Sequence, residues 1–129
     1  MYYRDRRYCN VDVLKGKTLS KVTGGVGDDE ITFVTTEGET YRMLHNQDCC
    51  ESVSIQDIIG DLQDLVGSEI LIAEEVEGES PADFDYEYLD SYTWTFYKFA
   101  TIKGYVDIRW FGSSNGYYSE GVDFCKMGI

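Results

Sequence analysis

The sequence is poor in positive charge. Its 129 residues include 11 lysines and arginines against 24 aspartates and glutamates, which gives a formal net charge of -13 and a pI of about 4.2. A surface of that sign repels phosphate backbones and anionic lipids. Free nucleic acid and anionic membranes are therefore poor partners for the protein, and a basic protein is a better one.

Long apolar runs are also missing. No stretch approaches the roughly 20 apolar residues that span a bilayer. Arg4, Arg6 and Arg7 stand near the N-terminus but no apolar segment follows them, so the pattern does not match a secretory signal. The sequence predicts a cytosolic protein that does not enter the membrane.

Signatures of catalysis are scarce. His45 is the only histidine, so the chain cannot supply the histidine pair of a metal-dependent phosphodiesterase. The glycines in the stretch 24–27 precede two aspartates and indicate a turn, because they lack the spacing of a phosphate-binding loop. We expect no enzyme and no cofactor, and a carboxylate-only site stays open as an alternative.

The four cysteines suit an intracellular protein as free thiols, and neighbours in a chain rarely bond to each other. Two of them belong to a cluster that has the residue types of a metal site or of a thiol active site: His45, Asp48, Cys49, Cys50 and Glu51. The cluster lacks the paired Cys-x-x-Cys knuckles of zinc modules, so we expect no metal. A thiol nucleophile with His45 as its base stays open. The favoured interpretation is structural, with one cysteine buried and the acids capping a following helix.

Apolar residues at spacings of three and four predict that helix. Ser54 is its expected N-cap and Gly67 its expected stop. Aspartates lie between the apolar positions, which is typical of an amphipathic helix packed on a sheet. The apolar stripe consists of Ile55, Ile58, Ile59, Leu62, Leu65 and Val66.

Strand patterns surround the expected helix. We expect strands over 17–23, 31–36, 39–44, 70–74, the hairpin described below, and 117–124. The fold class that follows is α+β, an antiparallel sheet of about six or seven strands with one main amphipathic helix packed on a face. Residues 1–14 are expected as an N-terminal arm and residues 15–129 as a single domain.

A hairpin of aromatic and β-branched residues carries the candidate site. The segments 92–101 and 104–111 are separated by a tight reversal at Lys103 and Gly104. We expect Thr101 opposite Val106, so that one face is apolar and belongs in the core. The opposite face then carries Trp94, Phe96, Lys98, Asp107, Arg109 and Phe111, with Lys98 opposite Arg109 and Phe96 opposite Phe111.

That face supports two interpretations. Two cations opposite each other repel unless an anion or a carboxylate lies between them, so Lys98 and Arg109 could hold phosphate while Trp94, Phe96 or Phe111 stacks on a base. Alternatively, both faces of the hairpin are buried, one of them against a second subunit, and nearby acids pair the cations. The turn at 113–116 adds Ser114 and Asn115 as candidate phosphate donors.

Three motifs carry a resemblance to known proteins. Residues 47–53 read QDCCESV, residues 91–98 read SYTWTFYK and residues 113–120 read SSNGYYSE. Together they resemble a family of small proteins carried by phages and prophages, over roughly residues 16–124. Small oligomeric phage proteins of this size include signal sponges, such as the anti-Thoeris proteins, which sequester cyclic ADP-ribose isomers or cyclic oligonucleotides made by bacterial defence systems.

The resemblance implies a homo-oligomer, a dimer or higher, that acts in the host cytoplasm and sequesters a nucleotide-derived signal without chemistry. The alternative function is an acidic inhibitor that imitates nucleic acid and binds a basic host defence protein or nuclease. The acid-rich half of the chain from Asp57 to Asp90 favours this alternative, because carboxylates of the expected helix and of the following loop could present charge at intervals like phosphates. Residues 75–90 are acidic and contain no lysine or arginine, which predicts an exposed loop.

Overall fold

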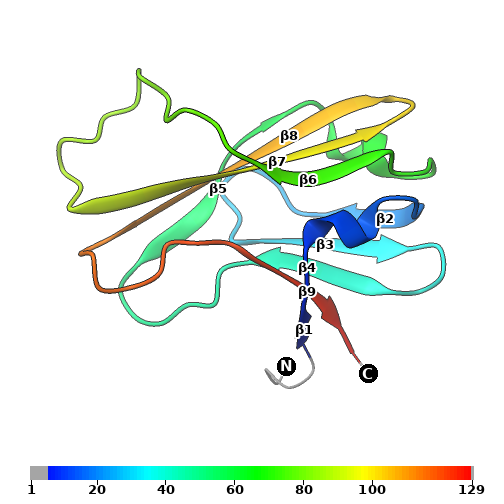
Figure 1. Cartoon of the computed structure of the whole chain (residues 1–129), viewed down its shortest axis with the longest axis horizontal. Coiled ribbons are helices and arrows are strands. Elements are labelled where there is room, and N and C mark those ends of the chain that lie inside the picture. The colour runs from blue at the N-terminus through cyan, green and yellow to red at the C-terminus, as the bar shows by residue number, and fades with distance from the viewer. Residues whose placement is uncertain (1–5, 129) are drawn as a thin grey trace.

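The computed structural model describes residues 6–128, and within them nearly all regular structure is β-strand (Figure 1). Two 3₁₀ helices, η2 and η3, are the only helical elements of this part of the chain. The elements are β1 Arg6–Tyr8, η2 Val11–Leu14, β2 Leu19–Thr23, β3 Glu30–Thr35, β4 Thr40–Leu44, β5 Ser52–Ile59, η3 Leu62–Leu65, β6 Ile72–Val76, β7 Ser91–Thr101, β8 Gly104–Ser114 and β9 Asp123–Met127.

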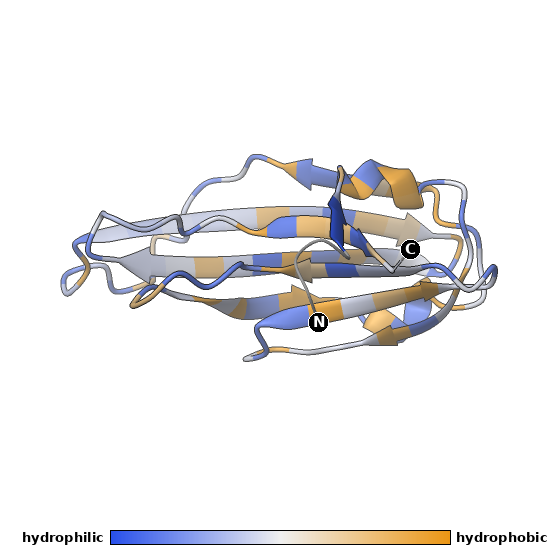
Figure 2. Ribbon diagram, turned by 90° about the horizontal axis from the view of Figure 1, so that it is seen from below, coloured by the Kyte–Doolittle hydropathy of each residue, from blue (hydrophilic) through white to orange (hydrophobic). Residues whose placement is uncertain are grey.

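The strands form two antiparallel sheets that pack face to face (Figure 1). The first sheet has the order β1-β9-β4-β3-β2 and the second has the order β5-β8-β7-β6. Hydrophobic and polar residues alternate along the strands in Figure 2, as a sheet with one buried face requires. The fold is therefore a β-sandwich, and the expected α+β class is wrong.

Large side chains from both sheets meet in the core. Phe33 of the first sheet and Phe99 of the second are both fully buried, with ring centroids 5.7 Å apart. Trp110 of β8 is also fully buried and directs its Nε1 at the Sδ of Met43 in β4, at 3.1 Å. Burying such a side chain stabilises a fold by about 1.5–3 kcal/mol. These contacts fix which face of β7 and β8 points inward.

The expected amphipathic helix does not exist. Residues 52–59 form β5, which pairs with β8 and contains an irregularity between Ile55 and Asp57. After a turn at Gly60, η3 buries Leu62 and Leu65. The apolar spacing of three and four thus arises from a strand, a turn and a 3₁₀ helix in sequence, each of which buries its own residues. The β-branched composition of 53–59 favours a strand and was the better signal.

The other expected strands are confirmed near 17–23, 31–36 and 39–44, and the strand expected at 70–74 lies slightly later, as β6. The strand expected over 117–124 is wrong, because β8 continues to Ser114 and the next strand, β9, begins at Asp123. No helix in residues 6–128 is long and apolar enough to cross a membrane.

The expected N-terminal arm lies partly outside the described residues. Within them, β1 pairs with β9, and Val11 and Leu14 of η2 are buried in the core cluster.

Gly60 ends β5 in a conformation that favours glycine. Its φ is +100°, and a Cβ built there would lie 2.5 Å from the backbone oxygen of Tyr105. We expect Gly60→Ala to lower the free energy of unfolding by more than the roughly 1–2 kcal/mol that a left-handed backbone costs an alanine, because the clash adds to that cost.

The control for this prediction is Gly38→Ala. Gly38 has a φ of +89° and no atom within 4 Å of a built Cβ, so its substitution carries the conformational cost alone. Urea denaturation of both variants measures the difference. Equal losses of stability in the two variants would contradict a steric role for Gly60.

Candidate functional site

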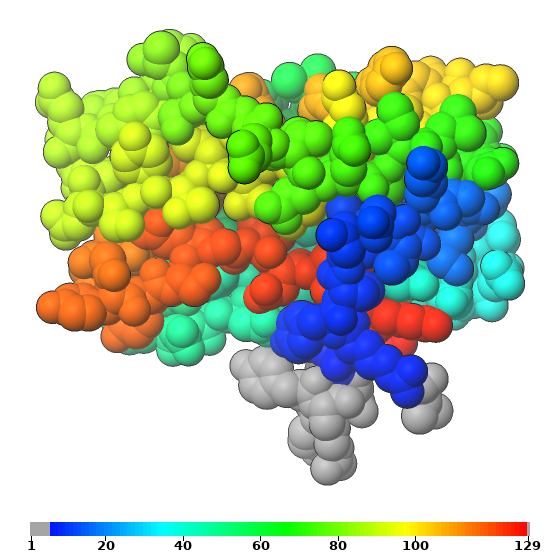
Figure 3. All heavy atoms as spheres, in the orientation of Figure 1, coloured from blue at the N-terminus to red at the C-terminus, as the bar shows by residue number. Residues whose placement is uncertain are grey.

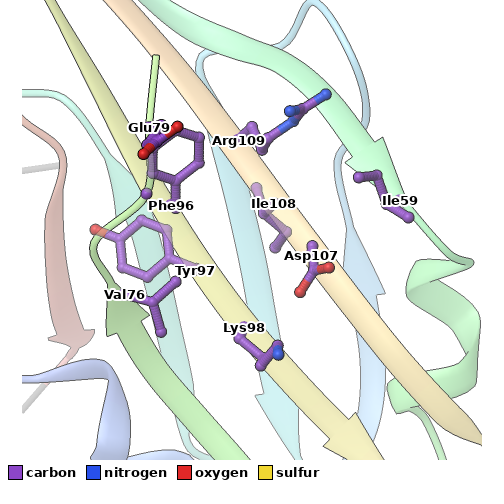
Figure 4. Close-up of a pocket in the computed structure, with 10 residues that line it drawn as sticks. Ile59, Val76, Glu79, Phe96, Tyr97, Lys98, Asp107, Ile108 and Arg109 are labelled. Atoms are coloured by element: carbon purple, nitrogen blue, oxygen red, sulfur yellow. The ribbon is translucent and has the colours of Figure 1, made fainter. Parts of the chain in front are cut away.

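An open cleft lies on the outer face of the second sheet, the face turned away from the core (Figure 4). We call it the outer cleft, and its volume is about 300 Å³. Residues of β5, β7 and β8 form its floor, and the chain that follows β6 forms one side. Its lining consists of Ile59, Val76, Gly78, Glu79, Phe96, Tyr97, Lys98, Asp107, Ile108 and Arg109.

The hairpin of β7 and β8 brings three of the seven candidate residues to this cleft. Its register pairs Phe96 with Arg109 and Lys98 with Asp107, and Thr101 with Gly104 at the turn. The expected register is wrong by two residues, because only Ile102 and Lys103 form the reversal. A shift of two keeps every side chain on its expected face, since the period of a strand is two.

The corrected register removes the expected repulsion between the two cations. Arg109 donates from Nη2 to Oδ2 of Asp57 in β5, at 2.5 Å, and Figure 4 shows its guanidinium leaning toward that strand. The Nε of Arg109 is buried and has no hydrogen-bond partner in residues 6–128. Asp57 was missed from the sequence because the expected helix placed it on a solvated face far from Arg109.

Lys98 is less constrained than Arg109. Its Nζ lies 5.4 Å from the ring centroid of Tyr105, and it forms no ion pair with any residue in 6–128. Its cross-strand neighbours are Asp107 and Glu74, so carboxylates lie on both adjacent strands. The outer cleft thus combines two cations with several acids. Of these two cations, only Arg109 forms an ion pair with an acid in residues 6–128, so the interpretation that nearby acids pair the cations applies to Arg109 and not to Lys98.

Trp94 and Phe111 lie beside the outer cleft, in an aromatic cluster with Phe84, Tyr86 and Tyr92. Phe84 packs against Phe111 at 4.7 Å and against Trp94 at 5.3 Å between ring centroids. Trp94 donates from Nε1 to the hydroxyl of Tyr86 at 3.0 Å. The expected acidic loop, residues 77–90 in the structure, therefore docks on its own sheet through Phe84 and Tyr86.

Phe96 is the aromatic candidate that faces the outer cleft itself. Its ring is parallel to that of Trp94, with centroids 6.0 Å apart. A Cβ built at Gly78 would come within 3.0 Å of the Phe96 ring, so the backbone of the loop lies directly against one side of that ring. Of the three aromatic residues expected to stack on a base, Phe96 is the one that lines the outer cleft.

Ser114 and Asn115 lie apart from the outer cleft. Ser114 follows Trp110 and Gly112 on the inward-facing side of β8, and its hydroxyl donates to Oε2 of the buried Glu120 at 2.5 Å. Asn115 accepts the backbone N–H of Tyr117 at 3.1 Å, within its own turn. Both side chains hold the 113–120 segment in place and are remote from Phe96, Lys98 and Arg109 in this arrangement.

Glu120 is the centre of that segment. Burial raises its pKa, but hydrogen bonds from Ser114 and from Thr93, at 2.8 Å, outweigh this effect and hold the pKa below its usual range. Gly112 lets the segment approach β8 closely, since a Cβ there would lie 2.6 Å from the backbone oxygen of Glu120.

The cluster around His45 is structural. The Nε2 of His45 lies 2.6 Å from Oε2 of Glu51, and its Nδ1 lies 2.7 Å from the backbone oxygen of Gly121, so both ring nitrogens are occupied. The Glu51 carboxylate also accepts the backbone N–H groups of Asp48 and Cys49, at 2.9 Å each. It therefore caps the 45–51 loop and not a helix. No ring nitrogen remains free to act as a base for a thiol.

Cys49 and Cys50 are both exposed, so the expectation that one of them is buried is wrong. Cys49 and Cys50 form a disulfide with each other, so the expectation of free thiols is wrong for this pair. Cys9 and Cys125 are free, and burial raises the pKa of both thiols. No group of three or more His, Cys, Asp or Glu side chains in residues 6–128 is arranged to hold a metal ion.

Most of the sequence matches one protein-family model. Residues 12–124 match the model of a domain of unknown function, DUF7448. The chain belongs to the DUF7448 family. No curated protein and no solved structure matches the chain. The matched region includes all of β2 to β8 and hence the whole outer cleft.

The Glu51 carboxylate predicts a pH dependence of stability. The hydrogen bond from His45, with those from the loop amides, lowers the pKa of Glu51 from 4.5 to about 2. A carboxyl group whose pKa falls on folding stabilises the fold above its unfolded pKa, and this contribution is lost as the pH falls from about 4.5 to about 2. We expect Glu51→Gln to be less stable than the wild type at pH 7 and to lose less of its stability across that window.

Urea denaturation between pH 2 and pH 7 measures this effect. The exposed Glu37, which forms no ion pair in the described chain, supplies the control substitution Glu37→Gln. Some acid sensitivity remains in both variants, because Lys17 and Lys126 lower the pKa of Glu39 to about 2. A Glu51→Gln profile parallel to that of the wild type contradicts the role assigned to Glu51.

Proposed function

We propose that the protein binds an anionic, nucleotide-derived signal in the outer cleft and sequesters it without chemistry, as a phage counter-defence protein in the host cytoplasm. The observation that carries the proposal is that Phe96, Lys98 and Arg109 line one cleft. A planar ring and two cations are the groups that recognise a base and a phosphate.

The acids around the cleft favour a nucleotide over a simple anion. Asp57 uses one of the five N–H donors of Arg109 and orients the guanidinium, which leaves other donors for phosphate oxygens. Glu79 lines the same cleft close to Phe96 (Figure 4). Its carboxylate can accept from ribose hydroxyls or from the exocyclic amine of a base. A nucleotide carries both an anion and such donors, whereas inorganic phosphate carries only the anion.

The size of the outer cleft favours a two-subunit site. A volume of about 300 Å³ is at the lower end of small-molecule sites and suits one nucleotide unit. Cyclic dinucleotides carry two such units, and cyclic ADP-ribose isomers carry one such unit joined to a second ribose phosphate. Two copies of the chain that face each other across a two-fold axis would enclose both halves, which agrees with a homo-oligomer as the binding form.

The first test is a thermal-shift panel of cyclic di- and trinucleotides and cyclic ADP-ribose isomers. A ligand that binds only the native state stabilises it by about 4 kcal/mol at a thousandfold excess over Kd. We expect a large upward shift of Tm with one class of ligand, and intact ligand in the supernatant after heat denaturation. Recovery of a new product instead of the ligand would show turnover and would contradict sequestration.

Substitutions assign the binding to the outer cleft. We expect Arg109→Ala and Lys98→Ala each to abolish the ligand-induced shift while the unliganded protein keeps a similar Tm. The matched control is Lys21→Ala, which removes one exposed cation from β2 in the other sheet. Binding that survives both cleft substitutions contradicts the proposed site.

The second candidate function is the acidic inhibitor of a basic host defence protein or nuclease. It is favoured by the acidic loop, whose carboxylates are all exposed while Phe84 and Tyr86 anchor the backbone to the sheet: Glu77, Glu79, Asp83, Asp85, Glu87 and Asp90. We expect such binding to weaken steeply with salt, to survive Arg109→Ala and to fail after Glu-to-Gln changes in the loop. Binding with the opposite pattern would exclude this function.

A further inference from the structure

The free edge of β6 is an interaction surface that the outer cleft does not use. Each sheet of the sandwich has two edge strands, and an edge strand presents unpaired N–H and C=O groups to any chain that can pair with them. The two sheets end at β1 and β2, and at β5 and β6. Three of these four edges are short or covered in part by the chain itself.

The edges of β2 and β5 are each covered in part, at one residue. Leu19 of β2 forms a bridge with Val66, and its backbone oxygen accepts the N–H of Gly67. Ile55 of β5 exchanges backbone hydrogen bonds with the 27–28 turn. The edge strand β1 has three residues within the described range 6–128. Within residues 6–128, β6 is the one edge strand of five or more residues that forms no backbone hydrogen bond outside its own sheet, although η2 packs beside it.

A groove runs along this edge. It lies between β6 and η2, which are neighbours in Figures 1 and 3, and its volume is about 430 Å³. Both sides carry acids, Asp12 from η2 and Glu74 and Glu75 from β6, while Lys15 is the one cation. Leu71, which is 49% exposed, offers an apolar contact at one end.

The charges of the groove select its occupant. A second copy of the chain that paired its own β6 antiparallel with this edge would bring Glu74 and Glu75 close to their own counterparts, and like charges across a strand pair are destabilising. A segment rich in lysine and arginine would instead be attracted by these acids. It would pair its backbone with β6 and its side chains with the acids on both sides.

We propose that the free edge of β6 binds an extended, lysine- and arginine-rich segment of a partner protein by β-strand addition. The five residues of β6 span about 16 Å, so the bound segment is five to seven residues long. Because neighbouring residues of a strand point to opposite faces, Glu74 and Glu75 select basic residues at consecutive positions of the partner. This edge adjoins the outer cleft, which Val76 of β6 lines, but strand addition there does not depend on nucleotide binding.

The test uses a fluorescent, end-blocked seven-residue peptide of valine and threonine with a central lysine–arginine–lysine run. Fluorescence anisotropy measures its binding to the full chain at 50 mM and 150 mM salt. Two matched peptides serve as controls: the same sequence with N-methylated amides at alternate residues, and a version in which glutamates replace the three basic residues.

We expect the basic peptide to bind, the N-methylated peptide to bind at least tenfold more weakly, and the glutamate peptide not to bind. The N-methylated peptide keeps every charge but cannot form the strand ladder, so equal binding of the two basic peptides would reduce the interaction to general electrostatics and overturn the proposal. Equal binding of the glutamate peptide would overturn it as well.

Substitutions in the protein locate the contact. The double variant Asp12→Asn/Glu75→Gln keeps the shape of the groove and removes one charge from each side, and we expect it to weaken binding of the basic peptide about tenfold. The control variant Asp29→Asn/Glu37→Gln removes two exposed charges from the opposite sheet and should bind as the wild type does. Equal weakening of peptide binding in both variants would overturn the proposal. It would also be overturned if sedimentation showed that the wild-type protein is a dimer and this dimer did not bind the peptide because its β6 edges are occupied.

Discussion

The burial of one face of the β7–β8 hairpin is the constraint on which the site depends. Tyr97 and Phe99 of β7, with Ile108 and Trp110 of β8, are buried against the first sheet. Because side chains alternate along a strand, a slip by one residue would expose all of them, so the core fixes the register of both strands. The same register places Phe96, Lys98 and Arg109 on the opposite face. The residues that stabilise the sandwich therefore also position the outer cleft.

The loops determine which parts of that outer face stay accessible. Phe84 and Tyr86 of the acidic loop cover Trp94 and Phe111. At Gly78 the loop contacts one side of the Phe96 ring and leaves the rest of the outer cleft open. At the same end of the sheet, the buried carboxylates of Glu51 and Glu120 hold the 45–51 loop and the 113–120 segment through hydrogen bonds. The chain is strongly acidic, yet two of its cations, Lys98 and Arg109, lie where the outer face of the sheet is open. A local site for an anion and an acidic surface for a basic partner are thus compatible in one molecule.

The sequence predicted the hairpin and both its faces, because alternation along the segments 92–101 and 104–111 is a strong signal; the strands extend slightly further, over Ser91–Thr101 and Gly104–Ser114. It failed where short elements follow one another: Ile55, Ile58 and Leu62 repeat like a helix although they belong to a strand, its end and a 3₁₀ helix. That error hid Asp57, the partner of Arg109, since only the pairing of β5 with β8 brings the two together. The contact of Phe84 with Trp94 could not be predicted from the sequence either, because no local pattern encodes a contact between a loop and a strand face.

We propose that the outer cleft binds a nucleotide through Phe96, Lys98 and Arg109. An NMR titration of the isotope-labelled protein with the nucleotide that raises Tm most tests this assignment residue by residue. We expect the largest shifts at these three residues and at the neighbouring Asp57, Asp107 and Gly78, with intermolecular contacts from the base to the Phe96 ring. Shifts centred on the 113–120 segment or on the groove beside β6, with the outer cleft unchanged, would contradict it.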